Sequence, residues 1–245
     1  MTPPTPSPRG GTGRLVALLL LGTLTFLVLA LVAPWAWQQL HGGTPSATVD
    51  SAELPWHIEP QPDGGSRVLG LHLGRATLAD AGTRWPGELL KLALVRDPQG
   101  RLTLEAYVER VQAGFVQGKV VLTGEVDAAT LQRWADRATD REPQPSGAHR
   151  LTLHADDEVD ARRAPVAGLV FLPAARIDEA TAVDRFGPPA ERLATADGQV
   201  HLLYPPRGLV ISLDPQGRGK PVLQYVAPRD FARLQGPLKA APPPS

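Results

Sequence analysis

The sequence predicts an α+β protein with a single N-terminal transmembrane helix, followed by antiparallel meander sheets packed with short helices in two similar modules. Three observations predict this class. Residues 15–33 form an apolar run without a charged side chain, which is long enough to cross a bilayer as one helix. Short apolar runs then alternate with clusters of turn residues, the pattern of antiparallel strands. Several segments between these runs begin with helix-cap residues.

The charges around the apolar run predict its orientation. Arg9 and Arg14 precede the run without any acidic residue, and the next basic residue after it is Arg67. Lys and Arg near the end of a span stay on the cytoplasmic side of the membrane. We therefore expect the Pro- and Gly-rich residues 1–14 to be a disordered cytoplasmic tail, and the bulk of the chain to lie outside.

The membrane span itself is expected over residues 15–37. Arg14, Trp35 and Trp37 are the candidate membrane-interface residues, because basic and indole side chains favour the wet edges of a bilayer. A cleaved signal peptide is the alternative, but its apolar region is usually about 7–15 residues long. The run here is longer, and Pro34 directly follows it. The lipid bilayer is thus the first expected partner of the chain.

The composition of the chain excludes several classes of function and indicates where the protein is located. The 245 residues include 25 basic and 25 acidic side chains and no cysteine. Balanced charge argues against a nucleic-acid-binding surface. The lack of cysteine excludes a disulfide framework, a thiol nucleophile, Cys-ligated metal and lipid attachment through an N-terminal cysteine. Asn is absent and Lys is rare, whereas Ala, Arg, Pro and Gly abound, a usage typical of GC-rich bacterial genomes. We therefore expect a bacterial inner-membrane anchor and a periplasmic domain.

Polar stretches rich in Pro and Gly divide the outer part of the chain. Within the first of them, Trp56 and Ile58 could dock on the domain as an edge strand. The expected order is a linker over 38–66, a first α+β module over 67–139, a linker over 140–148, a second module over 149–236 and a disordered tail over 237–245.

The first module is expected to combine antiparallel strands with two capped helices. Thr77 and Asp80 have the spacing of a capping box at the start of one helix, which Pro86–Gly87 ends. Asp127 is the expected N-cap of the other helix, where apolar residues recur at helical spacing. The strands are expected at residues 68–73, 92–95, 102–108, 115–116 and 119–126.

The second module is expected to be a meander flanked by helices. Acidic residues early and arginines late predict a short helix within 154–165. Another helix is expected to start after Asp178 and to end at Gly187, and a last helical turn is expected over 228–234. The strands are expected at 150–153, 166–172, 192–194, 200–204, 209–213 and 221–226, and their short connections favour an antiparallel meander.

One pentapeptide occurs in both modules. Asp-Pro-Gln-Gly-Arg stands at 97–101 and again at 214–218, each time between two expected strands, and the strand that follows reaches a Tyr-Val pair. Similar order at a long period indicates duplication. Chance is the alternative, because Asp-Pro-x-Gly is a common solution for a type I turn.

Three stretches of the second module form a pattern over residues 170–231: Arg185–Pro189 (RFGPP), 197–204 (DGQVHLLY) and 209–217 (LVISLDPQG). This part of the chain resembles the SmpA/OmlA, or BamE-like, family of outer-membrane-assembly lipoproteins. The resemblance implies helices packed on a three-stranded antiparallel sheet and a role in binding other envelope proteins. The chain departs from the family in lacking a lipidation cysteine and in having Leu202 where the family often has Trp. The tandem layout also resembles beta-lactamase-inhibitor proteins at the level of fold.

The candidate interaction residues lie near the end of the expected meander. Tyr, Phe and Arg are enriched at interface centres. The exposed turn from Tyr204 to Arg207 is the strongest candidate. For Tyr225 and Phe231 the alternative is that they fill the core between the sheet and a terminal helix. The full set of candidates is Tyr204, Pro206, Arg207, Tyr225, Arg229 and Phe231.

The sequence contains no recognisable catalytic, cofactor or metal motif. Ser66 and Ser212 lack the surroundings of an activated nucleophile, and no G-x-S-x-G occurs. His149 and His154 stand near several acids, which the first turn of a helix explains, and His201 fits a sheet position. We therefore expect no enzymatic activity, no cofactor and no metal. A pair of carboxylates, as in glycosidases, is the remaining catalytic alternative.

These observations predict a membrane-anchored periplasmic module that binds another envelope protein, as an adaptor in cell-envelope or outer-membrane assembly. Two other classes stay open. One is an inhibitor or sensor domain that captures a soluble protein or a small ligand. The other is a wall-active hydrolase with a carboxylate pair.

Overall fold

The structure is a computed structural model that describes residues 53–85 and 89–240. The predicted cytoplasmic tail and membrane anchor, with the interface residues Arg14, Trp35 and Trp37, lie outside these ranges. Within the described ranges, no helix is long and apolar enough to cross a membrane.

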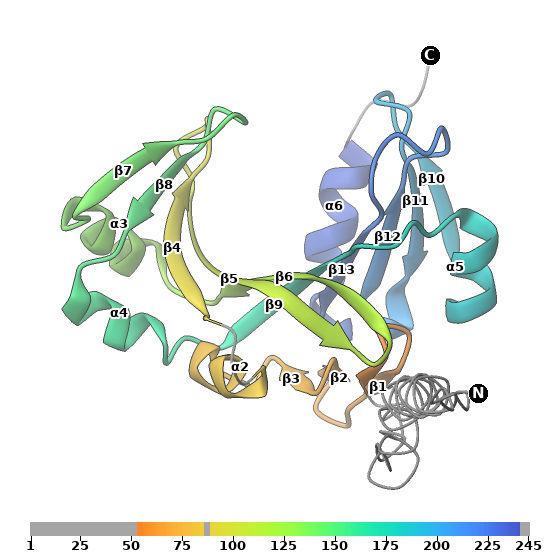
Figure 1. Cartoon of the computed structure of the whole chain (residues 1–245), viewed down its shortest axis with the longest axis horizontal. Helices are drawn as coiled ribbons and strands as arrows, with labels where there is room; N and C mark the ends of the chain where they lie inside the picture. The colour runs from red at the N-terminus through yellow and green to blue at the C-terminus, as the bar shows by residue number, and fades with distance from the viewer. Residues whose placement is uncertain (1–52, 86–88, 241–245) are drawn as a thin grey trace, which may run out of the picture. The chain divides into compact units, whose positions relative to one another are not determined.

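Ten antiparallel strands form one continuous sheet on which short helices pack, so the fold is α+β, as predicted (Figure 1). The strand order is β10-β11-β12-β13-β9-β6-β5-β4-β8-β7. The predicted meander is formed by β10 to β13, each of which pairs with the next. The strands are β4 (Lys91–Arg96), β5 (Leu102–Ala113), β6 (Val116–Gly124), β7 (Asp140–Pro143), β8 (His149–Thr152), β9 (Val166–Pro173), β10 (Glu191–Ala194), β11 (Val200–Tyr204), β12 (Leu209–Leu213) and β13 (Val222–Val226).

A three-stranded sheet precedes the large one in the chain. The expected single strand over 68–73 is interrupted, because Leu69 and Gly70 adopt positive φ values of +50° and +79° and turn the chain back. The expected linker over 38–66 extends too far, since its last part already forms paired strands. The three strands are β1 (Ile58–Pro60), β2 (Ser66–Val68) and β3 (Leu71–Leu73).

Three helices begin at the N-caps that the sequence predicts. Thr77, Asp127 and Asp178 each accept a backbone hydrogen bond from the third residue of the helix that follows. Gly187, at φ +77°, ends the helix that starts after Asp178. The last helix continues through Pro237, so the expected tail is helical at its start. The helices are α2 (Leu78–Arg84), α3 (Ala128–Asp136), α4 (Ala155–Ala161), α5 (Glu179–Phe186) and α6 (Ala232–Ala240), with 3₁₀ turns η2 (Pro205–Arg207) and η3 (Pro228–Asp230).

The segment 140–148, expected as a linker, forms the edge strand β7 and its turn into β8. β7 pairs with β8 along its whole length, and all four of its residues are exposed. Charged side chains and a proline suit an edge strand, because they oppose pairing with further strands. Such a strand has no apolar alternation, and its sequence therefore resembles a linker.

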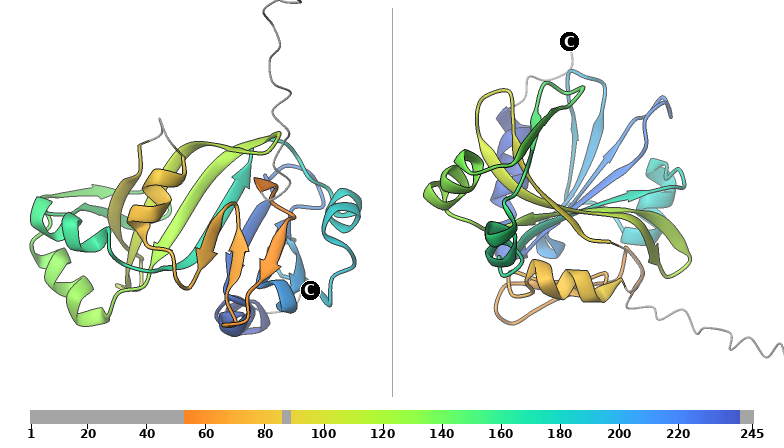
Figure 2. Two further views of the ribbon diagram at one scale, coloured as in Figure 1. Left: turned by 90° about the horizontal axis from the view of Figure 1, so that it is seen from below. Right: turned by 60° about the vertical axis from the view of Figure 1, so that its left-hand side comes forward.

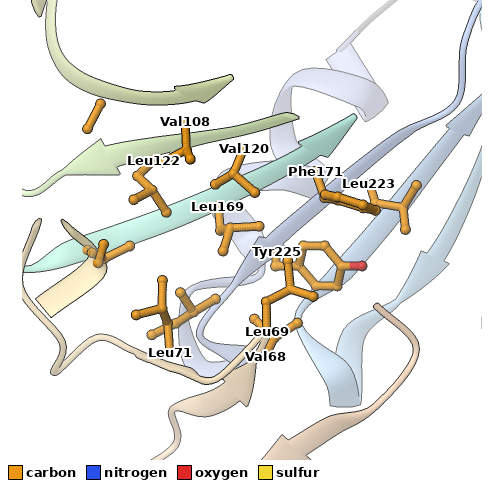
Figure 3. Packing of buried hydrophobic residues seen from close by; sticks show 14 of the residues in the cluster. Val68, Leu69, Leu71, Val108, Val120, Leu122, Leu169, Phe171, Leu223 and Tyr225 are labelled. Atoms are coloured by element: carbon orange, nitrogen blue, oxygen red, sulfur yellow. The ribbon is translucent and has the colours of Figure 1, made fainter. Parts of the chain in front are cut away.

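The large sheet is bent, so that its two ends rise on the same side of the middle strands (Figures 1 and 2). We call β4, β7 and β8 the N-terminal wing and β10 to β12 the C-terminal wing. The outer face of the sheet packs against β1–β3 and α2. This main core brings Val68 and Leu71 against Leu122, Leu169 and Tyr225 (Figure 3).

The inner face, opposite the main core, is covered by α6 over the C-terminal wing. Phe231, directly before α6, packs there with Leu203, Val210 and Val226 in a second buried cluster. The helices thus cover the inner face unevenly, which leaves side chains of the middle strands partly accessible.

The two halves of the sheet differ in strand order. Counting strands along each half, the first half is arranged β6-β5-β4-β8-β7 and the second β10-β11-β12-β13-β9. In chain order, the repeated pentapeptide joins β4 to β5, which are the first two strands of the first half. Its second copy joins β12 to β13, which are the last two strands of the second half. The observed topology does not repeat the expected order of elements.

Candidate functional site

A row of side chains crosses the inner face of the sheet. The strand register aligns Tyr107, Val121, Val170, Gln224 and Val210 across β5, β6, β9, β13 and β12. Val210 is buried beneath α6, whereas the other four side chains are half-buried. The inner face is therefore closed over the C-terminal wing and accessible over the middle strands.

A groove of about 770 Å³ lies between the end of α2 and strands β5, β6 and β9. Trp85, Val111 and Leu172 supply its apolar surface. Four lining side chains are basic and one is acidic, so the groove carries a net positive charge. The lining residues are Arg84, Trp85, Glu109, Arg110, Val111, Gln112, Gln117, Gly118, Lys119, Leu172, Ala174 and Lys220. We call this the Trp85 groove.

Two basic side chains of the Trp85 groove are held in place by hydrogen bonds. Arg84 donates from Nε to the carbonyl of Leu69 at 3.0 Å and from Nη2 to Glu53 at 2.8 Å. Lys119 donates from Nζ to Glu109 at 2.7 Å, and this hydrogen bond lowers the pKa of the Glu109 carboxyl. The rim is therefore basic but partly neutralised, and it suits a partner that combines acidic with apolar side chains.

The predicted interaction turn folds back on the end of α5. Tyr204 donates its hydroxyl to the carbonyl of Gly187 at 3.0 Å, and Arg207 donates from Nη1 to the carbonyl of Phe186 at 2.7 Å. Burial raises the pKa of the Tyr204 hydroxyl. Pro206 is exposed. These residues line a small groove of about 210 Å³.

The other predicted interaction residues contact the chain itself. Tyr225 is 1% exposed and donates its hydroxyl to the carbonyl of Pro55 at 3.0 Å, and burial raises its pKa well above the usual value. Phe231 is buried beneath α6. Both placements agree with the alternative that these rings fill the core. Arg229 donates from Nη1 to the carbonyl of Asp63 at 2.7 Å and so ties η3 to the turn between β1 and β2.

An aromatic row joins four distant parts of the chain, and of its rings only Tyr204 was among the predicted interaction residues. Phe115, at the tip of the β5–β6 hairpin, lies 5.6 Å from Trp56 between ring centroids. Trp56 meets Phe186 edge-on at 6.3 Å, and Phe186 lies 6.2 Å from Tyr204. The guanidinium of Arg185 stands 5.4 Å over the Trp56 ring. The sequence signals were Trp56, which was expected to dock on the domain, and the apolar Phe115 after a glycine.

A buried polar network connects β11 and β12 with the turn that follows β10. His201 binds the hydroxyl of Ser212 through Nδ1 at 2.8 Å and the hydroxyl of Thr195 through Nε2 at 3.1 Å. Thr195 in turn donates to Asp197 at 2.5 Å. Burial lowers the pKa of His201, against the opposing charge of Asp197. Ser212 is only 7% exposed, and it lines neither of the grooves described above.

Metal-binding side chains do not form a cluster in the described part of the chain. Residues 53–85 and 89–240 contain no group of three His, Asp or Glu side chains placed to hold a metal ion.

Comparisons with known proteins add no relative. No family model matches the chain, and no curated protein or solved structure shows significant similarity to it. The resemblance of residues 170–231 to the SmpA/OmlA family stays a prediction.

Proposed function

We propose that this chain is a membrane-anchored periplasmic protein-interaction module that acts as an adaptor in the bacterial cell envelope. The uncharged run at 15–33, the basic residues before it and the sequence resemblance of residues 170–231 support this proposal. The observation that carries it is the Trp85 groove, which joins apolar side chains to a basic rim. The proposal includes no catalytic step.

The composition of the Trp85 groove suits a protein partner. Interface centres are enriched in aromatic residues and Arg, and their rims are polar. Trp85 is 7% exposed and packs into the main core, so it would present a fixed wall rather than a mobile ring. Lys220 adds charge from the loop between β12 and β13, which widens the contact beyond α2 and the β5–β6 hairpin.

A site-specific crosslink from the groove tests the proposal. A photoreactive residue at Gln112, which is exposed in the groove, should yield one discrete crosslinked envelope protein in cells. The charge reversal Lys220→Glu should reduce the yield several-fold, because the partner is expected to be acidic there. A photoreactive residue at Ser146, in the exposed turn between β7 and β8, is the matched control and should yield no such product. Pro206 tests the turn that the sequence predicts in the same way.

Two results would count against the adaptor function. One is a folded, membrane-bound protein that yields no crosslinked protein from Gln112 or Pro206. The other is a product whose amount is unchanged by Lys220→Glu and is equally strong from Ser146, because such a product reports proximity rather than a site.

Ligand capture is the second candidate, and the volume of the Trp85 groove favours it. Small-molecule sites usually enclose about 300–1,000 Å³, and the groove falls within this range at about 770 Å³. A ligand that binds only the folded state raises its melting temperature. A thermal-shift screen of periplasmic metabolites with wild type and Lys220→Glu would show a shift that the substitution removes.

A further inference from the structure

The tip of the β5–β6 hairpin exposes a large apolar side chain. Phe115 is 62% exposed and follows Gly114, whose φ of +61° shapes the turn. Its ring lies against Trp56, and the guanidinium of Arg185 lies over the same indole. Phe115, Trp56 and Arg185 thus form one patch from three separate segments of the chain, which we call the Phe115 patch.

The chemistry of the Phe115 patch matches the interfacial zone of a lipid bilayer. Trp side chains favour this zone because they combine an apolar body with a polar edge. Arg keeps its charge in every environment and binds phosphate through a planar fork of donors. Phe115 contributes little to the main core, because most of its surface faces solvent. Phe115 is exposed, Trp56 is half-buried beside it, and Arg185 supplies the charge.

The proposed anchor would hold the Phe115 patch near a membrane. Trp56 stands three residues after Glu53, where the described part of the chain begins. The apolar run ends at Ala33, and residues 34–52 can span at most about 65 Å even when fully extended. A surface tethered at such a distance meets the bilayer at a high effective concentration, so weak contacts suffice for occupancy.

We propose that the Phe115 patch docks on the periplasmic surface of the lipid bilayer, with Phe115 inserted at the headgroup level and Arg185 on lipid phosphate. This second membrane contact rests on the anchor in the proposed function. It would fix the orientation of the domain relative to the membrane and leave the Trp85 groove to a partner.

Absence of cysteine from the chain allows a direct test with single-cysteine variants of the full chain. Phe115→Cys, labelled with an environment-sensitive fluorophore, is reconstituted in vesicles of phosphatidylethanolamine and phosphatidylglycerol with brominated acyl chains. Bromine quenches fluorophores in contact with the acyl region. We expect the label at 115 to be quenched at least about twofold more than a label on Ser146→Cys, in the exposed turn between β7 and β8. Equal quenching at both positions would overturn the proposal.

A second reporter removes the objection that the fluorophore itself enters the bilayer. A label on Gln117→Cys, exposed two residues after the tip, leaves Phe115 in place. Phe115→Asp and Arg185→Glu should each reduce the quenching of this label toward the Ser146 level, and unchanged quenching would contradict docking through the patch. Because these vesicles contain no other protein, strong quenching excludes a protein as the required occupant.

Flotation separates the failure of this inference from that of the proposed function. If the full chain does not float with vesicles after an alkaline wash, the anchor is wrong and both proposals fall. If it floats but the labels at 115 and 117 are not quenched, only docking of the patch is wrong. A crosslink from position 115 to a protein in cells, together with absent quenching, would assign the patch to a protein partner.

Discussion

The two wings of the sheet are built from similar antiparallel strands but are covered differently. β11 and β12 of the C-terminal wing are buried at every position, because the main core lies on one face and α6 on the other. Within residues 53–85 and 89–240, no helix covers the inner face of the N-terminal wing in this way (Figure 1). Arg150 of this wing stands 5.0 Å over the ring of Tyr107 on β5, whose hydroxyl donates to Glu105.

This difference indicates that the C-terminal wing stabilises the fold, whereas the N-terminal wing and the middle strands offer a surface to a partner. The C-terminal wing satisfies its buried polar groups internally, as in the network around His201. The N-terminal wing and middle strands keep half-buried charged and aromatic groups, which a partner can reach. The C-terminal wing is buried on both faces, so substitutions there should lower the free energy of unfolding strongly. Substitutions on the inner face of the N-terminal wing should lower it less.

Truncation of Phe231 should have the largest effect. Phe231→Ala removes the ring that joins α6 to the inner face of the C-terminal wing, and we expect the free energy of unfolding to fall by about 3–5 kcal/mol. Tyr107→Ala, on the inner face next to the N-terminal wing, should cost less than about 2 kcal/mol, because its ring is half-buried. Urea unfolding of the full chain in detergent measures both. Similar losses would contradict the difference between the wings.

Acid should weaken the C-terminal wing through His201. Burial holds the pKa of this imidazole below its ordinary value of 6.5, so the unfolded chain binds a proton more readily than the folded chain. Stability at neutral pH is therefore lost as pH falls from about 6.5 toward the lower folded pKa. His201→Gln should remove this part of the pH dependence, as measured by urea unfolding between pH 7.5 and 5.

Ser212→Ala is the matched control for the pH experiment. It removes the hydroxyl that binds Nδ1 but keeps the buried histidine. We expect this variant to be less stable by about 1–2 kcal/mol at every pH and to retain the loss in acid. If the control loses the pH dependence as well, the effect belongs to the hydrogen bond rather than to the titration of His201.

Local signals in the sequence predicted local structure well. The caps at Thr77, Asp127 and Asp178 were found because a cap joins a side chain to a backbone group three residues away. β7 was missed because an exposed edge strand carries no apolar alternation. The continuity of the sheet through β6 and β9 was missed because pairing between distant strands leaves no local pattern.

The candidate sites were harder to predict than the fold. Trp85 and Lys220 meet at one groove although they are distant in sequence, and no motif links them. Tyr225 and Phe231 have interface-type side chains, but packing places them in the core. Residue type alone could not decide between these uses, because the same aromatic rings stabilise a core and an interface.

The repeated pentapeptide provides the smallest and sharpest comparison between the two halves. In both copies the aspartate accepts a hydrogen bond from the backbone N–H two residues later, at 2.9 Å from Asp97 to Gln99 and at 2.9 Å from Asp214 to Gln216. Gly100 and Gly217 both adopt positive φ, +85° and +66°. The two turns are thus alike locally, although they join strands at different places in the sheet.

Alanine substitution at these two glycines should cost the same small amount. A methyl group at Gly100 would meet no atom within 4 Å, and one at Gly217 would make only an ordinary contact with Arg176 at 3.5 Å. The loss therefore reflects the backbone conformation alone, about 1 kcal/mol at each position. Equal losses in urea unfolding would mean that the pentapeptide is a self-contained turn, so its recurrence needs no duplication to explain it. A clearly larger loss at one position would show that the surrounding half, rather than the pentapeptide, determines the turn.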